Sequence, residues 1–255
     1  MSNDFERNNI DALNDLKAAI ERSDRIVALT GAGVSVPSGI PDFRSAHGLY
    51  STPFGRYPAE TVISHDFFLA HPKEFYDFYK SRMIYPNAKP NAMHKLLARL
   101  EKAGKIEGIV TQNIDGLHGA AGSQKVLELH GSIWRNRCER CHKFFDLEYI
   151  LSHDGVPHCD DCGGIVKPEV VLYGENLDED VLRKSVRALT RADMLVVIGT
   201  SLVVYPAAGL VGYFGGDVTA LINKSSTHLD SSADILLSQD CQEVALWLDA
   251  NLNLQ

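Results

Sequence analysis

Four cysteines form the most specific chemical pattern in the sequence. They come as two Cys-x-x-Cys pairs, Cys138 with Cys141 and Cys159 with Cys162. Four thiolates in two such pairs suit tetrahedral Zn²⁺, and they leave no open position for a substrate. We therefore predict one structural zinc site. A redox role fits less well, because neither pair opens a helix after a strand. The fifth cysteine, Cys241, is predicted to be a packing thiol.

A glycine-containing loop is the second candidate site. Residues 26–29 are a short apolar run typical of a strand buried on both faces, and Gly31-Ala32-Gly33 follows directly. With Ser35 as the cap of a helix, this order would form a cradle for phosphate groups. The signal alone is weak, because Val36 stands where the third glycine of G-x-G-x-x-G belongs.

The stretch after the loop departs from an ordinary dinucleotide fold. Such a fold continues into a second strand that ends in an acidic residue about 20 residues on. Here Pro37, Gly39 and Pro41 break any such strand, and Asp42-Phe43-Arg44 follows. We therefore predict a nucleotide site with an unusual lid.

Polar side chains also follow two further predicted strands. Gln112, Asn113 and Asp115 come after residues 106–111, and His130 comes after residues 125–129. Open α/β sheets bind ligands at this carboxyl edge, and histidine titrates near neutral pH, so His130 would suit a general base. Each residue alone is common in ordinary turns. Together, beside the glycine loop, they favour a nucleotide-dependent enzyme but do not identify its reaction.

Composition narrows the class of protein. The chain has 255 residues, a net charge of −8 and no basic run, which argues against direct nucleic-acid binding. No apolar run approaches the roughly 18 residues of a membrane span, so no membrane association is expected. The polar start of the chain does not resemble a signal peptide, and five cysteines without one indicate a reducing compartment. We expect a cytoplasmic protein.

Alternating apolar and helical patterns predict the fold class, an α/β fold with a doubly wound parallel Rossmann-like sheet. Strands are expected at residues 26–29, 106–111, 125–129, 170–172, 194–198, 218–222 and 235–237. Helices are expected at residues 9–22, 72–85, 92–102, 178–190 and 242–252, with another from Pro206. The predicted nucleotide domain comprises residues 1–39, 90–132 and 169–255. The two remaining stretches, residues 40–89 and 133–168, are expected to pack together as a small domain with a helical module and a zinc ribbon.

Taken in order, these motifs resemble those of the sirtuins, the family of NAD-dependent protein lysine deacylases, in the bacterial, undifferentiated type. The resemblance rests on residues 31–44, Thr111-Gln112-Asn113-Ile114-Asp115, Leu129-His130-Gly131, the four cysteines, Gly174-Glu175-Asn176 and residues 199–206. It covers the chain from about residue 10 to residue 250. The departures are few: Leu172-Tyr173 replaces two aromatic residues, and Val36 replaces Thr or Ala.

The resemblance implies an NAD-dependent protein lysine deacetylase that releases nicotinamide and O-acetyl-ADP-ribose. His130 would be the base, with Asn113 and Asp115 also catalytic. It implies cofactor contacts at Ala32, Gly33, Val36, Phe43, Arg44, Gln112, Asn113, Ile114, Asp115, His130, Thr200, Ser201, Asn223 and Cys241. An acetylated protein or peptide would add a strand along Val170, Val171, Leu172, Tyr173 and Gly174, opposite residues 203–205. The enzyme would be a monomer with one structural Zn²⁺.

Three other functions remain open. Mono-ADP-ribosyl transfer would use the same cofactor, and a non-catalytic NAD-sensing or zinc-ribbon module would not need Asn113, Asp115 and His130. A dehydrogenase is disfavoured by the missing second strand.

Within the deacylases, acetyl should be preferred over succinyl. Enzymes that remove acidic acyl groups carry Tyr-x-x-Arg, and the position three after Tyr76 is Tyr79. Tyr79-x-x-Arg82 has the right spacing only one helical turn later.

Overall fold

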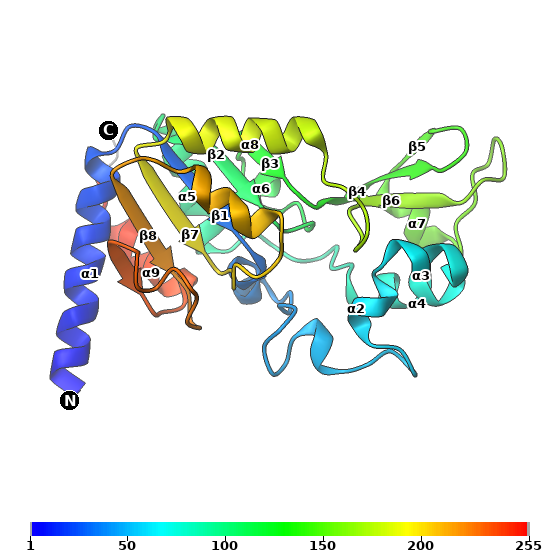
Figure 1. The fold of residues 1–255 in the computed structure, drawn as a ribbon, viewed down its shortest axis with the longest axis horizontal. Helices are drawn as coiled ribbons and strands as arrows, with labels where there is room; N and C mark the ends of the chain where they lie inside the picture. Colours follow the sequence, from blue (N-terminus) through cyan, green and yellow to red (C-terminus); the bar gives the residue numbers. More distant parts are fainter. Residues whose placement is uncertain (1, 254–255) are drawn as a thin grey trace.

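The computed structural model describes residues 2–253, with side chains from residue 9 onward. Its largest element is a six-stranded sheet in the order β3-β2-β1-β7-β8-β9, in which all neighbours pair in parallel (Figure 1). The strands are β1 (Ile26–Thr30), β2 (Ile106–Thr111), β3 (Val126–Glu128), β7 (Met194–Ile198), β8 (Val218–Ile222) and β9 (Ile235–Leu237). This confirms the predicted doubly wound sheet.

The order of the strands reverses beside β1. Strands β2 and β3 lie on one side of β1, and β7, the next strand of this sheet along the chain, lies on the other side of β1. Register pairs Thr30 with both Thr111 and Ile198, so these three strands end at one edge. In open α/β sheets a ligand binds outside the carboxyl ends at such a reversal.

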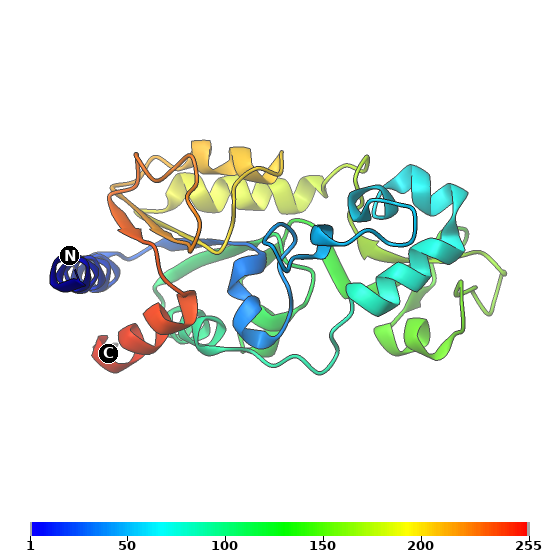
Figure 2. The same cartoon turned by 90° about the horizontal axis from the view of Figure 1, so that it is seen from below.

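Helices cover both faces of this sheet (Figures 1 and 2). One apolar cluster contains residues of α1 (Ser2–Arg22), α5 (Ala92–Lys102) and α9 (Cys241–Asn251), together with inward side chains of the strands. The opposite cluster contains residues of α8 (Glu179–Arg191) and the 3₁₀ helix η4 (Ala207–Tyr213). All five residues of β1 and of β7 are buried, as expected for strands between two helical layers.

A second lobe lies at one end of the sheet (Figure 1). It contains the short 3₁₀ turn η3 (Leu49–Ser51), four helices and an antiparallel sheet in the order β5-β4-β6. The helices are α2 (Ala59–Val62), α3 (His65–Ala70), α4 (Pro72–Arg82) and α7 (Leu147–Ser152), and the strands are β4 (Gly131–Cys138), β5 (Phe144–Phe145) and β6 (Val166–Val170). Both stretches expected to form the small domain contribute to one apolar cluster, in which four aromatic residues of α4 are fully buried. The exact domain boundaries stay a prediction.

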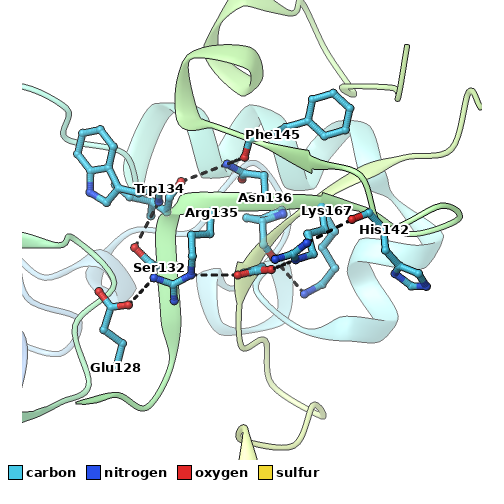
Figure 3. Close-up of polar contacts among 12 residues, drawn as sticks. Glu128, Ser132, Trp134, Arg135, Asn136, His142, Phe145 and Lys167 are labelled. Atoms are coloured by element: carbon cyan, nitrogen blue, oxygen red, sulfur yellow. Dashed lines mark hydrogen bonds and ion pairs between the residues drawn. The ribbon is translucent and has the colours of Figure 1, made fainter. Parts of the chain in front are cut away.

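Charged side chains connect the two sheets where β3 leads into β4. Arg135 donates from Nη1 to Glu128 at 2.7 Å and from Nε to Glu169 at 3.0 Å, and Arg137 also pairs with Glu169. Figure 3 shows the Arg135 side chain beside the carboxylate of Glu128. Because Glu128 ends a strand of the large sheet and Arg135 lies in the small one, the Arg135–Glu128 pair bridges the two lobes, whereas both pairs with Glu169 lie within the small sheet.

Several predicted elements were wrong in type or length. The helix expected after the glycine loop is a pair of 3₁₀ turns, η1 (Ala32–Val34) and η2 (Val36–Ser38), because Pro37 offers no N–H and Gly39 ends the second turn at φ 85°. The helix expected from Pro206 is the 3₁₀ helix η4.

Another wrong assignment concerns residues 170–172. The strand there is β6, which ends at Val170 and pairs antiparallel with β4 in the small sheet. The predicted strand therefore ran past its true end and began too late. Alternating burial along Val166–Val170 reflects a sheet with one covered face, a pattern that a short apolar run does not reveal.

Helix α4 ends at Arg82 rather than at residue 85. A short helix α6 (Leu117–Ala120) follows the polar rim after β2, and the sequence did not predict it. In the part of the chain that the structure describes, every helix is too short or too polar to cross a bilayer.

Candidate active site

A cavity of about 550 Å³ lies at the carboxyl edge of the large sheet, where the strand order reverses. Its walls come from the loops after β1, β2, β7 and β8 and from the segment after β6. The cavity brings together all but one of the residues predicted to bind cofactor or substrate or to act in catalysis. They are Ala32, Gly33, Val36, Phe43, Arg44, Gln112, Asn113, Ile114, His130, Thr200, Ser201, Asn223, Cys241 and residues 170–174. The exception is Asp115, which does not line it.

The glycine loop crosses the loop after β7 at very short range. Gly33 N donates to Gly199 O at 2.8 Å, and Gly31 N donates to Ile198 O at 3.0 Å. A Cβ at Gly33 would lie 2.7 Å from Gly199 Cα, and one at Gly31 would lie 2.6 Å from Thr200 Cβ. The two glycines therefore allow one loop to pack on another. The loops together form the end of the cavity predicted to hold phosphates.

Gln112 and Asn113 lie on the rim with parts of their amide groups already bonded. Asn113 Nδ2 donates to Gly31 O at 3.0 Å and to Ser35 Oγ at 3.1 Å, and Asn113 is 8% exposed. Gln112 Nε2 donates to Thr200 Oγ1 at 3.0 Å. Because both amide N–H groups of Asn113 hold the glycine loop, its Oδ1 is the atom left to face a ligand.

Asp115 lies behind this rim. Its Oδ2 accepts from Ser35 Oγ at 2.6 Å and its Oδ1 accepts from Leu117 N at 2.8 Å. Burial raises the pKa of the Asp115 carboxyl, although the bond from Ser35 acts in the opposite direction. Asp115 holds the loop from which Asn113 and Ile114 reach the cavity, and a direct role in catalysis stays a prediction.

His130 is held in one tautomer. Its Nδ1 lies 2.9 Å from the carbonyl oxygen of Gln112, and because a carbonyl only accepts, Nδ1 carries the proton. Burial lowers the pKa of His130, which favours the neutral ring. Nε2 then presents a lone pair to the cavity. Gly131 next to it has φ 74°, and a Cβ there would lie 1.7 Å from Glu169 O, so only glycine fits.

The segment after β6 forms another wall and is fixed by its backbone. Val171 N donates to His130 O at 3.0 Å, and Leu172 N donates to Glu175 Oε2 at 2.8 Å. Glu175 also contacts Lys167 at 3.1 Å and His65 at 2.8 Å. These contacts lower the pKa of the half-buried Glu175 carboxyl against the effect of burial.

Several wall residues were missed by sequence reasoning. Glu175 lies in the motif Gly174-Glu175-Asn176 but was not itself a predicted site residue, and Tyr50, Ile63 and Met83 lie in the insertion whose folding could not be predicted. A glutamate directly after Gly174 was a signal that could have singled out Glu175.

At the far end of the cavity, Asn223 follows β8 and Cys241 begins α9. Lys224 Nζ lies 2.7 Å from Asp240 Oδ2, and both residues line the same end. Cys241 is 6% exposed and belongs to the apolar cluster, and burial raises the pKa of its thiol to about 12. The prediction that Cys241 is a packing thiol is confirmed.

The four predicted metal ligands meet at the tip of the small sheet. The sulfur atoms of Cys138, Cys141, Cys159 and Cys162 lie within 4.8 Å of one another, and no other residue type joins this cluster in the described chain. The Sγ atoms of Cys138 and Cys162 are 3.3 Å apart, and those of Cys141 and Cys159 are 3.6 Å apart. Four sulfur atoms around one Zn²⁺ at about 2.3 Å require separations near these. The donor set therefore fits a closed, structural zinc site.

Comparison with known proteins agrees with this geometry. A family model described as the Sir2 family matches residues 31–206. An NAD-dependent protein deacetylase of Clostridium perfringens is 54% identical over 236 residues, 92% of this chain and 97% of that protein. One of Staphylococcus aureus is 44% identical over 234 residues, 91% of this chain and 96% of that protein.

Solved structures agree in fold. A Sir2 structure with a p53 peptide and NAD⁺ has a TM-score of 0.80 and 42% identity, covering 94% of this chain and 95% of its own. A Sir2 structure bound to an acetylated peptide has a TM-score of 0.83 and 41% identity, covering 93% and 97%. On sequence, fold and site, this chain belongs to the Sir2 family.

Proposed function

We propose that this protein is an NAD-dependent protein lysine deacetylase. The reaction consumes one water molecule, transfers the acetyl group of acetyl-lysine to ADP-ribose and yields nicotinamide, the free lysine and O-acetyl-ADP-ribose. The observation that carries the proposal is His130, a neutral histidine with its proton fixed on Nδ1 and its Nε2 facing the cavity. NAD supplies the electrophilic ribose carbon from which nicotinamide departs.

The chain supplies a base and a shaped cavity. His130 Nε2 would take a proton from a ribose hydroxyl, and the Gln112 carbonyl would stabilise the imidazolium that forms. Asn113 Oδ1 would orient the ribose, since its N–H groups already hold the glycine loop. Ile114, with Asp115 behind it, would position the nicotinamide carboxamide.

The remaining cofactor contacts would follow the cavity from end to end. Phe43 and Arg44 would exclude water from the reacting bonds. Ala32, Gly33, Val36, Thr200 and Ser201 would hold the phosphates, Asn223 the adenosine ribose, and the main chain at Cys241 the adenine.

An acetylated peptide would add a strand between residues 170–174 and residues 203–205. The N–H groups of Val171, Leu172 and Tyr173 are bonded within the chain. By contrast, the carbonyl of Val171 accepts no hydrogen bond from any described residue. A peptide N–H would therefore pair with the Val171 carbonyl.

The test is incubation with NAD and an acetyl-lysine peptide, following nicotinamide release and peptide mass together. We expect equal amounts of nicotinamide and of peptide lighter by one acetyl group. A peptide that keeps its acetyl group and gains ADP-ribose would instead support mono-ADP-ribosyl transfer. NAD binding without turnover would support a sensing module.

We extend the proposal to the compartment, the oligomeric state and the domain boundaries of the protein. Five free cysteines, four of them at one metal site, support a reducing compartment, and we propose the cytoplasm. We also propose a monomer divided at residues 39/40, 89/90, 132/133 and 168/169. Light scattering after size-exclusion chromatography tests the monomer, and limited proteolysis tests the division.

A further inference from the structure

Two tyrosine hydroxyl groups meet at the wall of the cavity. Tyr50 belongs to the loop at residues 42–50, which follows the glycine turns, and Tyr173 belongs to the segment after β6. Their Oη atoms are 3.0 Å apart, and both residues line the cavity. Within residues 2–253, this is the one hydrogen bond that joins residues 42–50 to residues 170–175.

Tyr50 holds the two residues proposed to close over the cofactor. Its N–H donates to Phe43 O at 2.9 Å, and its ring lies 5.4 Å from the Phe43 ring in an edge-on arrangement. The guanidinium carbon of Arg44 lies 5.4 Å from the centre of the same ring. A shift of Tyr50 therefore shifts Phe43 and Arg44 with it.

Tyr173 is fixed by its main chain. Its N–H donates to Ile63 O at 3.0 Å, and its carbonyl accepts from His65 N at 2.9 Å. Arg44, Ser45 and His47 in the facing loop are exposed. A rigid support on one side and an exposed loop on the other mean that Tyr173 restrains the loop.

One of the two tyrosine O–H groups is not used in the bond between them. Burial, followed by the bond to Tyr173, raises the pKa of Tyr50, so its hydroxyl stays protonated at neutral pH. Of two neutral hydroxyls, one donates to the other and the second O–H remains free. The free O–H lies on the wall of the cavity, where a bound ligand can alter the pair.

We propose that Tyr173 is a positioning residue that couples binding of the acylated peptide to closure of residues 42–50 over NAD. The inference rests on the proposed deacetylase function. The peptide would occupy the segment that carries Tyr173, and Tyr173 would hold Tyr50, Phe43 and Arg44 in the closed position. Since such coupling is reciprocal, a seated cofactor also strengthens peptide binding.

The experiment compares Tyr173→Phe, Tyr50→Phe and the double variant with the full-length parent. Each substitution removes one oxygen and keeps the ring. The control is Tyr213→Phe, because the exposed Tyr213 lies outside the cavity and its hydroxyl has no hydrogen bond in the described chain. Calorimetry measures the Kd of ADP-ribose, which occupies the cofactor site without reacting, with and without acetyl-lysine peptide. Steady-state kinetics separate the KM for NAD from kcat.

In the parent we expect the peptide to tighten ADP-ribose binding. Loss of one hydrogen bond should reduce that gain and raise the KM for NAD by about two- to tenfold, with kcat nearly unchanged. The double variant should behave like either single variant, because both break the same bond. The control should match the parent.

Peptide-dependent tightening that persists in Tyr173→Phe would overturn the inference, and so would additive effects in the double variant. A fall in kcat with an unchanged KM for NAD would also overturn it. A parent that does not deacetylate would instead refute the proposed function, so the two failures are distinct.

Discussion

The two lobes are stabilised by different means. In the large lobe, five- and six-residue apolar strands lie between helices, and the loops at their ends touch main chain to main chain, as Gly33 does with Gly199. In the small lobe, the antiparallel sheet has three strands, and its stability depends on four buried aromatic residues of α4, ion pairs and a cluster of thiolates. The stability of the large lobe therefore depends on its apolar strands and on close main-chain contacts between loops. The stability of the small lobe depends on particular side chains. Substitutions should separate the two.

The largest expected effect is loss of the metal. Cys138→Ser or Cys159→Ser should release zinc and unfold the small lobe, because metal binding of this kind contributes on the order of 10 kcal/mol to folding in small zinc modules. Zinc content and thermal melting are the measurements. Cys241→Ser is the matched control, since Cys241 packs in the large lobe and should keep the metal. A metal-free variant that melts like the parent would contradict the structural role.

His130→Ala should leave both lobes intact and remove the chemistry. Loss of a general base costs about 10²- to 10⁴-fold in rate. We expect NAD to bind with little change, because the side chain acts after the cofactor is seated. The measurements are kcat for deacetylation, NAD affinity and thermal melting. Turnover within a few-fold of the parent would remove His130 from the mechanism.

The preference for one acyl group over another should depend on side chains of the small lobe that lie near the cavity. Arg82 Nη1 donates to Thr52 O at 2.8 Å, its guanidinium lies over Phe54 and Phe78, and it does not line the cavity. A succinyl carboxylate would therefore enter without Arg82 as its partner, and kcat/KM should favour an acetyl peptide by about 10²-fold or more. The comparison uses matched acetyl and succinyl peptides. Equal turnover would mean that Arg82 reaches the cavity.

The smallest effect at neutral pH concerns the large lobe, where His94 and His118 are buried with ring centres 4.8 Å apart. Burial lowers the pKa of His94 to about 4 and that of His118 to about 3, from about 6.5 in the unfolded chain. Between these values the unfolded chain binds more protons, so the free energy of unfolding should fall as pH drops from about 6.5 to 4.

Urea unfolding at a series of pH values measures the slope of the free energy of unfolding against pH. That slope should be smaller in His118→Asn. The exposed His47 offers a control, because His47→Asn should keep the slope of the parent. An unchanged slope in His118→Asn would contradict the assignment.

The same contrast explains how far the sequence could be interpreted. Strands 194–198, 218–222 and 235–237 and the helix at residues 92–102 have the predicted bounds, because short apolar runs and a capping Asn91 are local signals. The glycine loop was recognised as a site, but the helix expected after it was wrong, since Gly39 ends the second 3₁₀ turn at φ 85°.

The cysteine spacing predicted the metal cluster because four ligands must converge on one ion. Contacts between distant side chains were out of reach. No local pattern pairs Tyr50 with Tyr173 or Ser35 with Asp115, because such contacts join residues that are far apart in the sequence.

The main chain around His130 has a further consequence for enzyme engineering. Its ring is held by the carbonyl of Gln112, and its own carbonyl holds the N–H of Val171. Neither bond uses the side chain of Val171 or Leu172, so both are expected to survive exchanges there that keep the N–H of residue 171. The wall formed by Val171 and Leu172 can therefore be rebuilt without displacing the base, so that new substrate preferences are open to this scaffold by exchanges that leave its reaction intact.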